Sequence, residues 1–261
     1  MQNKECCTPQ KNRINYQKEL EKLLASLEAE RISGNGKKKR LLLHACCAPC
    51  SSYVLEYLRE KFDITVLYYN PNITEREEYE KRSAELKRLA RQMNEESAGA
   101  GWPEKGSVPT EPAVLPSGFI LVEEGEWEPQ RFFEVSKGLE SLPEGGERCF
   151  RCYELRLRET ARIAAERDFD YFTTTLTISP LKNAEKLNEI GARMAEEYGV
   201  AFLPSDFKKK NGYKRSVELS EKYGLYRQDY CGCIFSRAER DRRRADGQPT
   251  DAVTVLRKAE L

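Results

Sequence analysis

Three short groups of cysteine residues are the part of this sequence best suited to chemistry. Seven of the nine cysteines in the 261-residue chain belong to them. The first cysteine group is Cys46/Cys47/Cys50, the second is Cys149/Cys152 and the third is Cys231/Cys233. Thiolates bind metal ions and iron–sulfur clusters, and paired thiols exchange electrons by forming disulfides. We expect the fold to bring the three groups together into one site.

The first two groups contain enough thiols for a metal centre. The spacing Cys149-x-x-Cys152 lets two thiolates reach one metal from a turn that opens a helix. With Cys46 and Cys47 the count is four thiolates, the usual complement of a 4Fe–4S cluster. A structural zinc ion is the alternative. Adjacent ligands such as Cys46 and Cys47 are unusual in zinc sites, which favours the cluster.

The third group, Cys231-Gly232-Cys233, indicates a redox pair. Thiols separated by one residue can form a strained disulfide, and strained, exposed disulfides are often labile or catalytic. Gly232 has no side chain where the chain must turn tightly. A second pair of metal ligands is the less favoured interpretation of this spacing.

Four residues have less specific assignments. Cys50 lies one turn beyond Cys47 if a helix has begun by then, so we place it in the site without a specific role. His44 is the only histidine and ends an expected strand, which predicts a buried, hydrogen-bonded structural residue. Cys6 and Cys7 precede the patterned sequence, and we interpret them as incidental thiols.

Strands and helices are expected to alternate along most of the chain. The expected strands lie at 41–45, 64–69, 119–122, 171–176 and 200–203. Helices are expected at 47–61, 74–96, 129–137, 183–198, 212–223 and 233–244, with another after Tyr153. This alternation predicts an α/β domain with a parallel sheet, whose ligands bind beyond the carboxyl ends of the strands. The first cysteine group follows the first expected strand.

Composition shifts suggest the domain boundaries. Residues 40–245 form the predicted catalytic domain, which includes appended C-terminal helices. Residues 1–39 are a predicted peripheral extension, and 246–261 are a predicted tail. Residues 97–118 are rich in Gly, Pro and Ser and are expected to form a surface insertion.

Charge and hydropathy restrict the function classes. Basic and acidic residues number 44 and 43, so the whole chain supplies no positive field that would attract nucleic acid. No run approaches the ~18 apolar residues that a membrane span needs. We therefore expect a cytoplasmic protein with no membrane partner, whose thiols are kept reduced for metal binding or redox catalysis.

Basic and aromatic residues are interleaved near the third cysteine group. They are Lys208, Lys209, Lys210, Tyr213, Lys214, Arg215, Tyr223, Tyr226, Arg227 and Tyr230. Such a pattern fits RNA, because basic groups neutralise phosphates and aromatic rings stack on unpaired bases. Solvated helix faces are an equally good explanation for any one of these residues. We interpret residues 237–244 as a solvated helix of mixed charge.

Four segments, in this order, resemble the QueH-type epoxyqueuosine reductases. They are LLLHACCAPC, ERCFRCYELR, FTTTLTISPLKN and YRQDYCGCIFS, and the resemblance covers about residues 40–240. It implies a Rossmann-like α/β domain of the adenine-nucleotide alpha-hydrolase type. It also implies an oxidoreductase that converts epoxyqueuosine to queuosine at the anticodon wobble position of tRNA. The implied cofactors are a 4Fe–4S cluster and an additional iron ion, without cobalamin.

The resemblance implies roles for the individual thiols. Cys46, Cys47, Cys149 and Cys152 match the cluster ligands, Cys231 and Cys233 match the redox pair, and Cys50 falls where a second metal is held. Removing the epoxide oxygen needs two electrons and two protons, and two thiols that form a disulfide can supply both electrons. Asp229 or Tyr230 is a candidate proton donor, whereas nothing in the sequence identifies the external electron donor.

Two other functions compete with this hypothesis. A zinc-stabilised RNA-binding protein without redox turnover would use the same cysteines for structure alone. An ATP-dependent sulfur transferase on a similar fold needs a phosphate-binding loop of the SGGxDS type after the first strand. The chain has CCAPCSS at that position, which disfavours the transferase.

Overall fold

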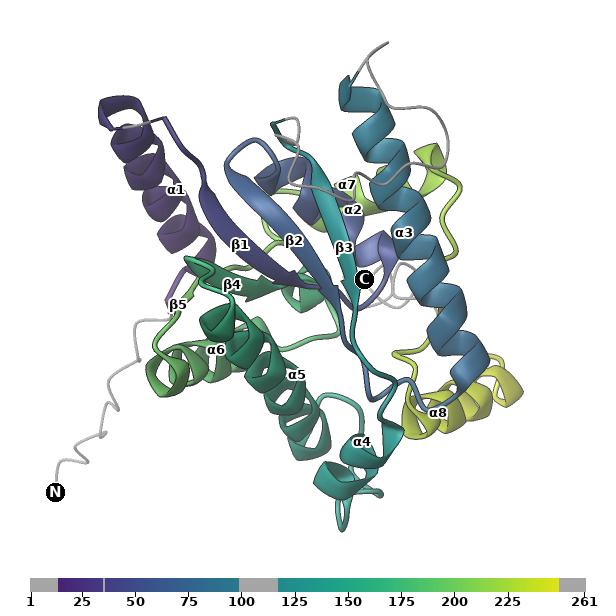
Figure 1. Cartoon of the computed structure of the whole chain (residues 1–261). Coiled ribbons are helices and arrows are strands. Elements are labelled where there is room, and N and C mark those ends of the chain that lie inside the picture. Colours follow the sequence, from purple (N-terminus) through teal and green to yellow (C-terminus); the bar gives the residue numbers. More distant parts are fainter. Residues whose placement is uncertain (1–13, 35, 99–116, 249–261) are drawn as a thin grey trace, which may run out of the picture.

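The computed structural model describes residues 14–34, 36–98 and 117–248, and its described strands form one parallel sheet. The strand order is β3-β2-β1-β4-β5 (Figure 1). The strands are β1 (Lys39–His44), β2 (Phe62–Tyr68), β3 (Ile120–Glu124), β4 (Tyr171–Thr174) and β5 (Ala201–Phe202). Because every pair is parallel, the carboxyl ends of all five strands lie at the same edge of the sheet.

The central strand β1 explains why the sheet is covered on both faces. Leu41, Leu42 and Leu43 are all fully buried, and Leu42 packs into a different apolar cluster from its two neighbours. Successive side chains of a strand point to opposite faces, so a run of leucines needs apolar cover on both.

Helices provide this cover in two layers (Figure 1). One layer contains α1 (Tyr16–Ser33), α2 (Ala48–Leu58), α3 (Arg76–Ala98) and α7 (Gly212–Lys222). The other contains α5 (Glu147–Glu166) and α6 (Ala184–Tyr198). The helices α4 (Pro129–Ser136) and α8 (Ile234–Ala245) meet beyond the carboxyl edge of the sheet, where the rings of Phe132 and Phe235 lie 6.1 Å apart.

The strand order creates a crevice at the end of β1. From β1 the chain continues to β2 on one side, whereas β4 pairs with the other side of β1. In open parallel sheets, ligands bind at such a switch point. The first cysteine group follows β1 here, and a 3₁₀ turn, η2 (Thr175–Ile178), follows β4. The predicted Rossmann-like α/β fold with C-terminal helices is confirmed.

Some expected boundaries differ from the structure. β4 ends at Thr174, so residues 175 and 176 belong to the 3₁₀ turn and not to the strand. α5 already begins at Glu147, so the second cysteine group lies inside this helix. α1 buries Leu20 and Leu24 in the core beside the sheet, although the division of the chain into domain, extension and tail stays a prediction. Cys6, Cys7, residues 99–116 of the insertion and residues 249–261 of the tail lie outside the described residues.

A candidate metal and redox site lined by cysteines

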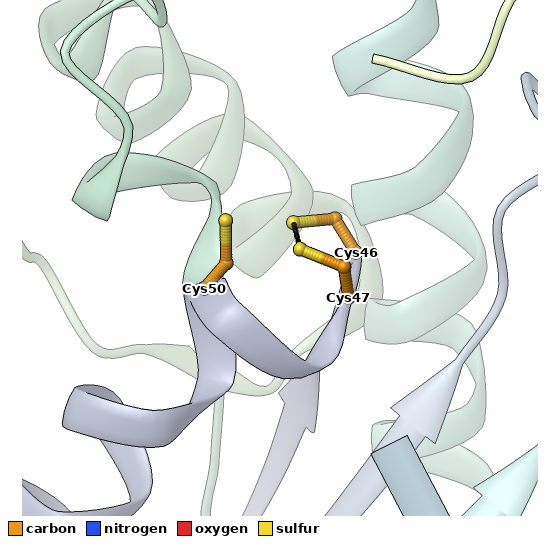
Figure 2. A group of neighbouring side chains, drawn as sticks. All are labelled: Cys46, Cys47 and Cys50. Carbon is orange, nitrogen blue, oxygen red and sulfur yellow. Dashed lines mark hydrogen bonds between the residues drawn. The ribbon is translucent and has the colours of Figure 1, made fainter. Parts of the chain in front are cut away.

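The first cysteine group forms a compact cluster of thiols. The sulfur atoms of Cys46, Cys47 and Cys50 all lie within 4.8 Å of one another (Figure 2). Cys47 caps the amino end of α2, Pro49 occupies the first turn, and Cys50 projects from that turn toward the other two thiols. Backbone N–H groups and the helix dipole favour thiolates at this position.

Hydrogen bonds distribute charge unevenly within this cluster. The Cys46 and Cys47 sulfurs are 3.7 Å apart. Hydrogen bonds from Cys46 and Cys50 hold the pKa of Cys47 well below its usual value, whereas the bond to Cys47 raises the pKa of Cys46 to about 11. The same contacts raise the pKa of Cys50. Cys47 is therefore the most easily deprotonated thiol of the cluster, and a bound metal would displace the remaining protons.

The last residues of β1 and β4 position the first cysteine group. His44 and Thr174 are the paired last residues of these strands, and His44 Nδ1 lies 2.8 Å from Thr174 Oγ1. His44 Nε2 lies 3.1 Å from the carbonyl of Tyr69, so both ring nitrogens have partners. Burial lowers the pKa of His44 to about 3, which keeps the ring neutral. The sequence-based prediction of a buried, hydrogen-bonded structural histidine agrees with this geometry.

The second cysteine group lies in the first turns of α5. Cys149 and Cys152 are buried, and the backbone N–H of Gly145 donates to the Cys149 sulfur at 3.3 Å. Burial raises the pKa of both thiols, that of Cys152 to about 11, and the charge of Cys231 adds to this effect. Cys149 packs in the same apolar cluster as Cys46, and Cys152 packs with Cys231 and Cys233. The second group thus connects the other two.

The third cysteine group sits on a tight loop before α8. The Cys231 and Cys233 sulfurs are 3.6 Å apart, and Gly232 between them has φ +110°. A Cβ at Gly232 would lie 2.7 Å from Cγ1 of Ile73, so the predicted need for glycine at this turn is confirmed. Arg82 of α3 donates to the Cys231 carbonyl at 3.2 Å and holds the loop in place.

The two thiols of this group differ in their acidity. The hydrogen bond between them lowers the pKa of Cys231 and raises that of Cys233. The ammonium of Lys182, itself paired with Glu144 at 2.5 Å, also favours the Cys231 thiolate. A thiolate beside a thiol is the form in which a dithiol begins redox exchange.

A cavity of about 140 Å³ lies between the first and third cysteine groups. Cys46, Cys50 and Cys231 are part of its wall, together with Lys182 and Arg156. A water molecule needs only roughly 10–15 Å³ of such volume, so the cavity has room for a reacting group beside the thiols. Structural zinc sites are closed by four ligands, whereas this arrangement faces open space.

Asp229 and Tyr230 also line the cavity but differ in environment. Burial raises the pKa of Asp229, but the hydrogen bond and charge of Arg240 outweigh it, with Arg244 adding to a net lowering. Burial raises the pKa of Tyr230, whose ring lies under the guanidinium of Arg240 at 4.6 Å. Tyr230 therefore keeps its proton, which favours it over Asp229 as the proton donor.

Only part of the predicted basic and aromatic cluster faces the site. Tyr213, Arg227 and Tyr230 line the cavity. Five others contact residues elsewhere: Lys208 pairs with Asp206, Lys210 with Glu21, Arg215 with Glu56 and Glu218, Tyr223 with Glu96, and Lys81 lies over the ring of Tyr226. Lys209 and Lys214 do not line the cavity either. The interpretation of residues 237–244 as a solvated helix of mixed charge agrees with α8, in which none of these residues is buried, but Arg240 and Arg243 also line the cavity.

Sequence reasoning missed three polar residues of the site: Arg82, Arg156 and Lys182. Arg156 lies one helical turn after Cys152, so the spacing of the second cysteine group could have indicated it. Lys182 follows the 3₁₀ turn at the end of β4, an edge already expected to bind ligands. Arg82 is distant in sequence from every cysteine, and no local pattern identifies it.

The donor set fits an iron–sulfur cluster better than a structural zinc ion. The three groups hold seven described thiols, of which those of Cys46, Cys50 and Cys231 line one cavity, and seven is more than a single tetrahedral zinc needs. No disulfide joins these seven described cysteines. A parallel α/β fold with thiol groups gathered at its switch point defines the class of this protein: a Rossmann-like protein with a thiol-based metal and redox site.

Comparison with known proteins gives a family within that class. Residues 41–239 match the family described as epoxyqueuosine reductase QueH. The chain is 38% identical to epoxyqueuosine reductase QueH of Staphylococcus epidermidis over 226 residues, which is 86% of this chain and 85% of that protein. It is also 38% identical to the Streptococcus pyogenes protein of that name (86% and 78% covered) and 35% identical to the Thermotoga maritima one (79% and 94%). The chain belongs to the epoxyqueuosine reductase QueH family.

Proposed function

We propose that this chain reduces epoxyqueuosine to queuosine in tRNA, at the cavity between the first and third cysteine groups. The observation that carries the proposal is that the first and third cysteine groups, distant in sequence, line one cavity at the switch point of the sheet, while the second group packs against both. The relatives named epoxyqueuosine reductase QueH share most of the chain length, which supports the same reaction here. A tRNA substrate favours the cytoplasm as the compartment. The described helices include none long and apolar enough to cross a membrane.

The third cysteine group can supply the two electrons that this reduction consumes. The epoxide loses its oxygen as water and becomes an alkene, which consumes two electrons and two protons. Cys231 and Cys233 supply two electrons when they form a disulfide, and their sulfurs must move from 3.6 Å to roughly 2.05 Å to do so. The Cys233 thiol supplies one proton to the water, and the second comes from solvent, with Tyr230 as the group that passes a proton at the cavity wall. An external electron donor then reduces the disulfide.

The remaining thiols are proposed to hold the cofactors. Cys46, Cys47, Cys149 and Cys152 would bind a 4Fe–4S cluster, and Cys50, whose sulfur faces the same cluster of thiols, would contact an additional iron ion. Bound at these residues, the cluster would supply single electrons and the iron would supply Lewis acidity.

The mouth of the cavity suits an unpaired nucleotide. Tyr213 and Arg227 stand together on one wall, with the ring centroid 6.0 Å from the guanidinium carbon. Arg240 and Arg243 of α8 line another part of the wall. An aromatic ring can stack on an unpaired base, and neighbouring basic groups can neutralise its phosphates. Recognition of single-stranded RNA uses both contacts.

Anaerobic purification and assay test this function. We expect a brown protein that contains iron and acid-labile sulfide and converts epoxyqueuosine in tRNA to queuosine, measured by mass spectrometry of the nucleosides. Cys46→Ala and Cys149→Ala should lose iron and turnover together. A colourless protein with one tightly bound zinc, and tRNA affinity without turnover, would show that the cysteines serve a zinc-stabilised RNA-binding protein instead.

A further inference from the structure

One face of α5 carries two polar groups that the reaction described above does not use. Cys149, Cys152, Tyr153 and Arg156 are spaced at three and four residues, so they lie on the same face of the helix. Tyr153 and Arg156 are 1% and 4% exposed. Both are among the most costly groups to bury unless their polar atoms find partners.

Arg156 has no ion-pair partner within the described ranges. Its guanidinium donates to the carbonyl of Cys152 at 3.3 Å and to Asn70 Oδ1 at 3.4 Å, and no carboxylate in residues 14–34, 36–98 or 117–248 pairs with it. The other buried arginines have more partners: Arg82, 2% exposed, pairs with Glu78 at 2.6 Å. Arg59 and Arg148 each make three hydrogen bonds to backbone carbonyls, whereas Arg156 makes only the two hydrogen bonds of 3.3 Å and 3.4 Å. A buried positive charge without an acidic partner needs another source of negative charge.

The sulfur atoms of the cysteine groups become that source once they are deprotonated or hold a cluster. Arg156 lines the cavity together with Cys46 and Cys231 and donates to the carbonyl of Cys152, so it lies beside all three of these residues. These thiols belong to all three cysteine groups. Asn70 fixes the direction of the side chain, because its amide also donates to the carbonyl of Ala45 at 2.8 Å, next to Cys46. Arg156 is thus held where the three groups converge.

Tyr153 adds a second donor with no partner. Its hydroxyl oxygen is buried and makes no hydrogen bond to any described residue. The charges of Lys182, Cys149 and Cys152 all act on this hydroxyl, so it lies on the same side of α5 as the second cysteine group. An unsatisfied buried hydroxyl costs about 1–3 kcal/mol, and a ligand that accepts its hydrogen bond removes that cost.

We propose that Arg156 and Tyr153 are positioning residues for the cysteine-held cluster, whose sulfur atoms accept their N–H and O–H groups and whose negative charge Arg156 compensates. The inference rests on the proposed cluster-dependent reduction. Net charge and hydrogen bonds to sulfur are the protein's main means of setting the potential of such a cluster. Both residues therefore raise the reduction potential and make the cluster easier to reduce.

Redox titration of the anaerobically purified, iron-loaded protein tests this inference. In Arg156→Gln, iron and sulfide content should persist while the potential becomes more negative. At the wild-type midpoint, the ratio of reduced to oxidised cluster should fall from one to about one tenth, a tenfold change that corresponds to about 59 mV for a one-electron couple. Arg156→Lys keeps the charge and should shift the potential less. Tyr153→Phe should shift it in the same direction as Arg156→Gln.

Tyr79→Phe is the matched control for the hydroxyl. Tyr79 is also buried, 2% exposed, but its hydroxyl donates to the Gly125 carbonyl at 2.7 Å. In the metal-free protein, Tyr79→Phe should lower the melting temperature, whereas Tyr153→Phe should leave it unchanged or raise it. In the loaded protein only Tyr153→Phe should change the potential.

The outcomes separate the inference from the proposed function. If iron-loaded Arg156→Gln and Tyr153→Phe keep the wild-type potential, the inference is overturned and the proposed function is not. A lower melting temperature for metal-free Tyr153→Phe would have the same consequence. A wild-type protein that binds no iron would overturn both. If Arg156→Gln does not fold, Tyr153→Phe decides the question, because removing an unpartnered hydroxyl leaves the packing of α5 intact.

Discussion

The hydroxyl of Thr175 accepts the backbone N–H of Cys46 at 3.3 Å and donates to the Cys46 sulfur at 3.6 Å. Thr175 follows β4 and Cys46 follows β1, so one side chain connects the two strand ends that form the crevice. The contact fixes both the backbone and the thiol of a proposed cluster ligand. The position of the first cysteine group thus depends on a strand more than 120 residues away in the sequence.

Thr175→Val should loosen this contact. The substitution keeps the shape of the side chain but leaves the buried N–H of Cys46 without an acceptor, so the free energy of unfolding should fall by about 1–3 kcal/mol. Iron content after anaerobic reconstitution should fall as well. Urea unfolding and iron quantification measure the two effects. Thr175→Ser keeps the hydroxyl and should behave like the wild type; equal losses in both variants would argue against the hydrogen bond.

Cys231→Ser and Cys233→Ser should separate electron transfer from cluster binding. Both variants remove the redox pair, so multiple-turnover reduction of epoxyqueuosine should fall to the background rate. Their iron and sulfide content should stay near that of the wild type, unlike that of Cys46→Ala. Nucleoside mass spectrometry and iron analysis give the two readouts. Turnover that survives in Cys231→Ser would remove the dithiol from the reaction.

Gly232→Ala should damage the loop of the third cysteine group. A φ of +110° is strained for alanine, and the new Cβ would lie 2.7 Å from Ile73. Strain and overpacking together should lower the free energy of unfolding by about 2–4 kcal/mol. Gly224→Ala is the control, since Gly224 also has a positive φ but a Cβ added there would have no neighbouring atom within 4 Å. It should cost about 1 kcal/mol. Thermal or urea unfolding of both variants compares them, and equal costs would contradict the proposed clash.

Arg227→Ala should weaken tRNA binding without changing iron content. Loss of one phosphate contact reduces the slope of log affinity against log salt by about 0.7–0.9. Arg215→Ala is the control, because Arg215 pairs with Glu56 at 2.7 Å and does not line the cavity. Fluorescence anisotropy with a labelled anticodon stem-loop at several salt concentrations measures the slopes. An unchanged slope for Arg227→Ala would place the RNA elsewhere.

Glu85 should make part of the stability depend on pH. Its carboxylate pairs with Arg88 at 2.7 Å and accepts the backbone N–H of Tyr226 at 2.7 Å, ahead of the third cysteine group. The hydrogen bond with Arg88 lowers the pKa of Glu85 below its usual value of 4.5. Its contribution to stability is therefore present above pH 4.5 and is lost as the pH falls through the folded-state pKa.

Comparison with Glu85→Gln measures this contribution. The wild type should be the more stable protein at pH 7, and the difference in the free energy of unfolding should shrink toward pH 3. Urea unfolding at a series of pH values gives the difference directly. A difference that stays constant between pH 7 and pH 3 would show that the carboxylate is not favoured in the folded state.

Local patterns in the sequence were sufficient for the fold class. The leucine run at 41–43 and the β-branched run at 64–67 predicted buried strands, and both occur in the sheet. Periodic apolar positions predicted the helices that cover it. These features follow from contacts between neighbours along the chain, which is why errors were confined to boundaries such as the end of β4.

The composition of the site was only partly predictable. The cysteine groups and Tyr230 could be recognised because their types and spacings suit thiol chemistry. Arg240 and Arg243 looked like a solvated helix, since nothing in their own segment shows that α8 packs beside the cavity. Arg82 was missed for the same reason: it contacts the Cys231 loop across 149 positions of sequence.

The sequence by itself determined the number of thiols, their spacing and the elements that carry them, because these depend on residue types and local propensities. Only the tertiary structure decided that the first and third groups line one cavity, that the second group packs against both, and that Arg156 is buried beside them without a carboxylate partner among the described residues. Pairing of β1 with β4 and packing of α8 beyond the sheet are contacts between distant residues. Burial and charge compensation arise from such contacts, and no local pattern contains them.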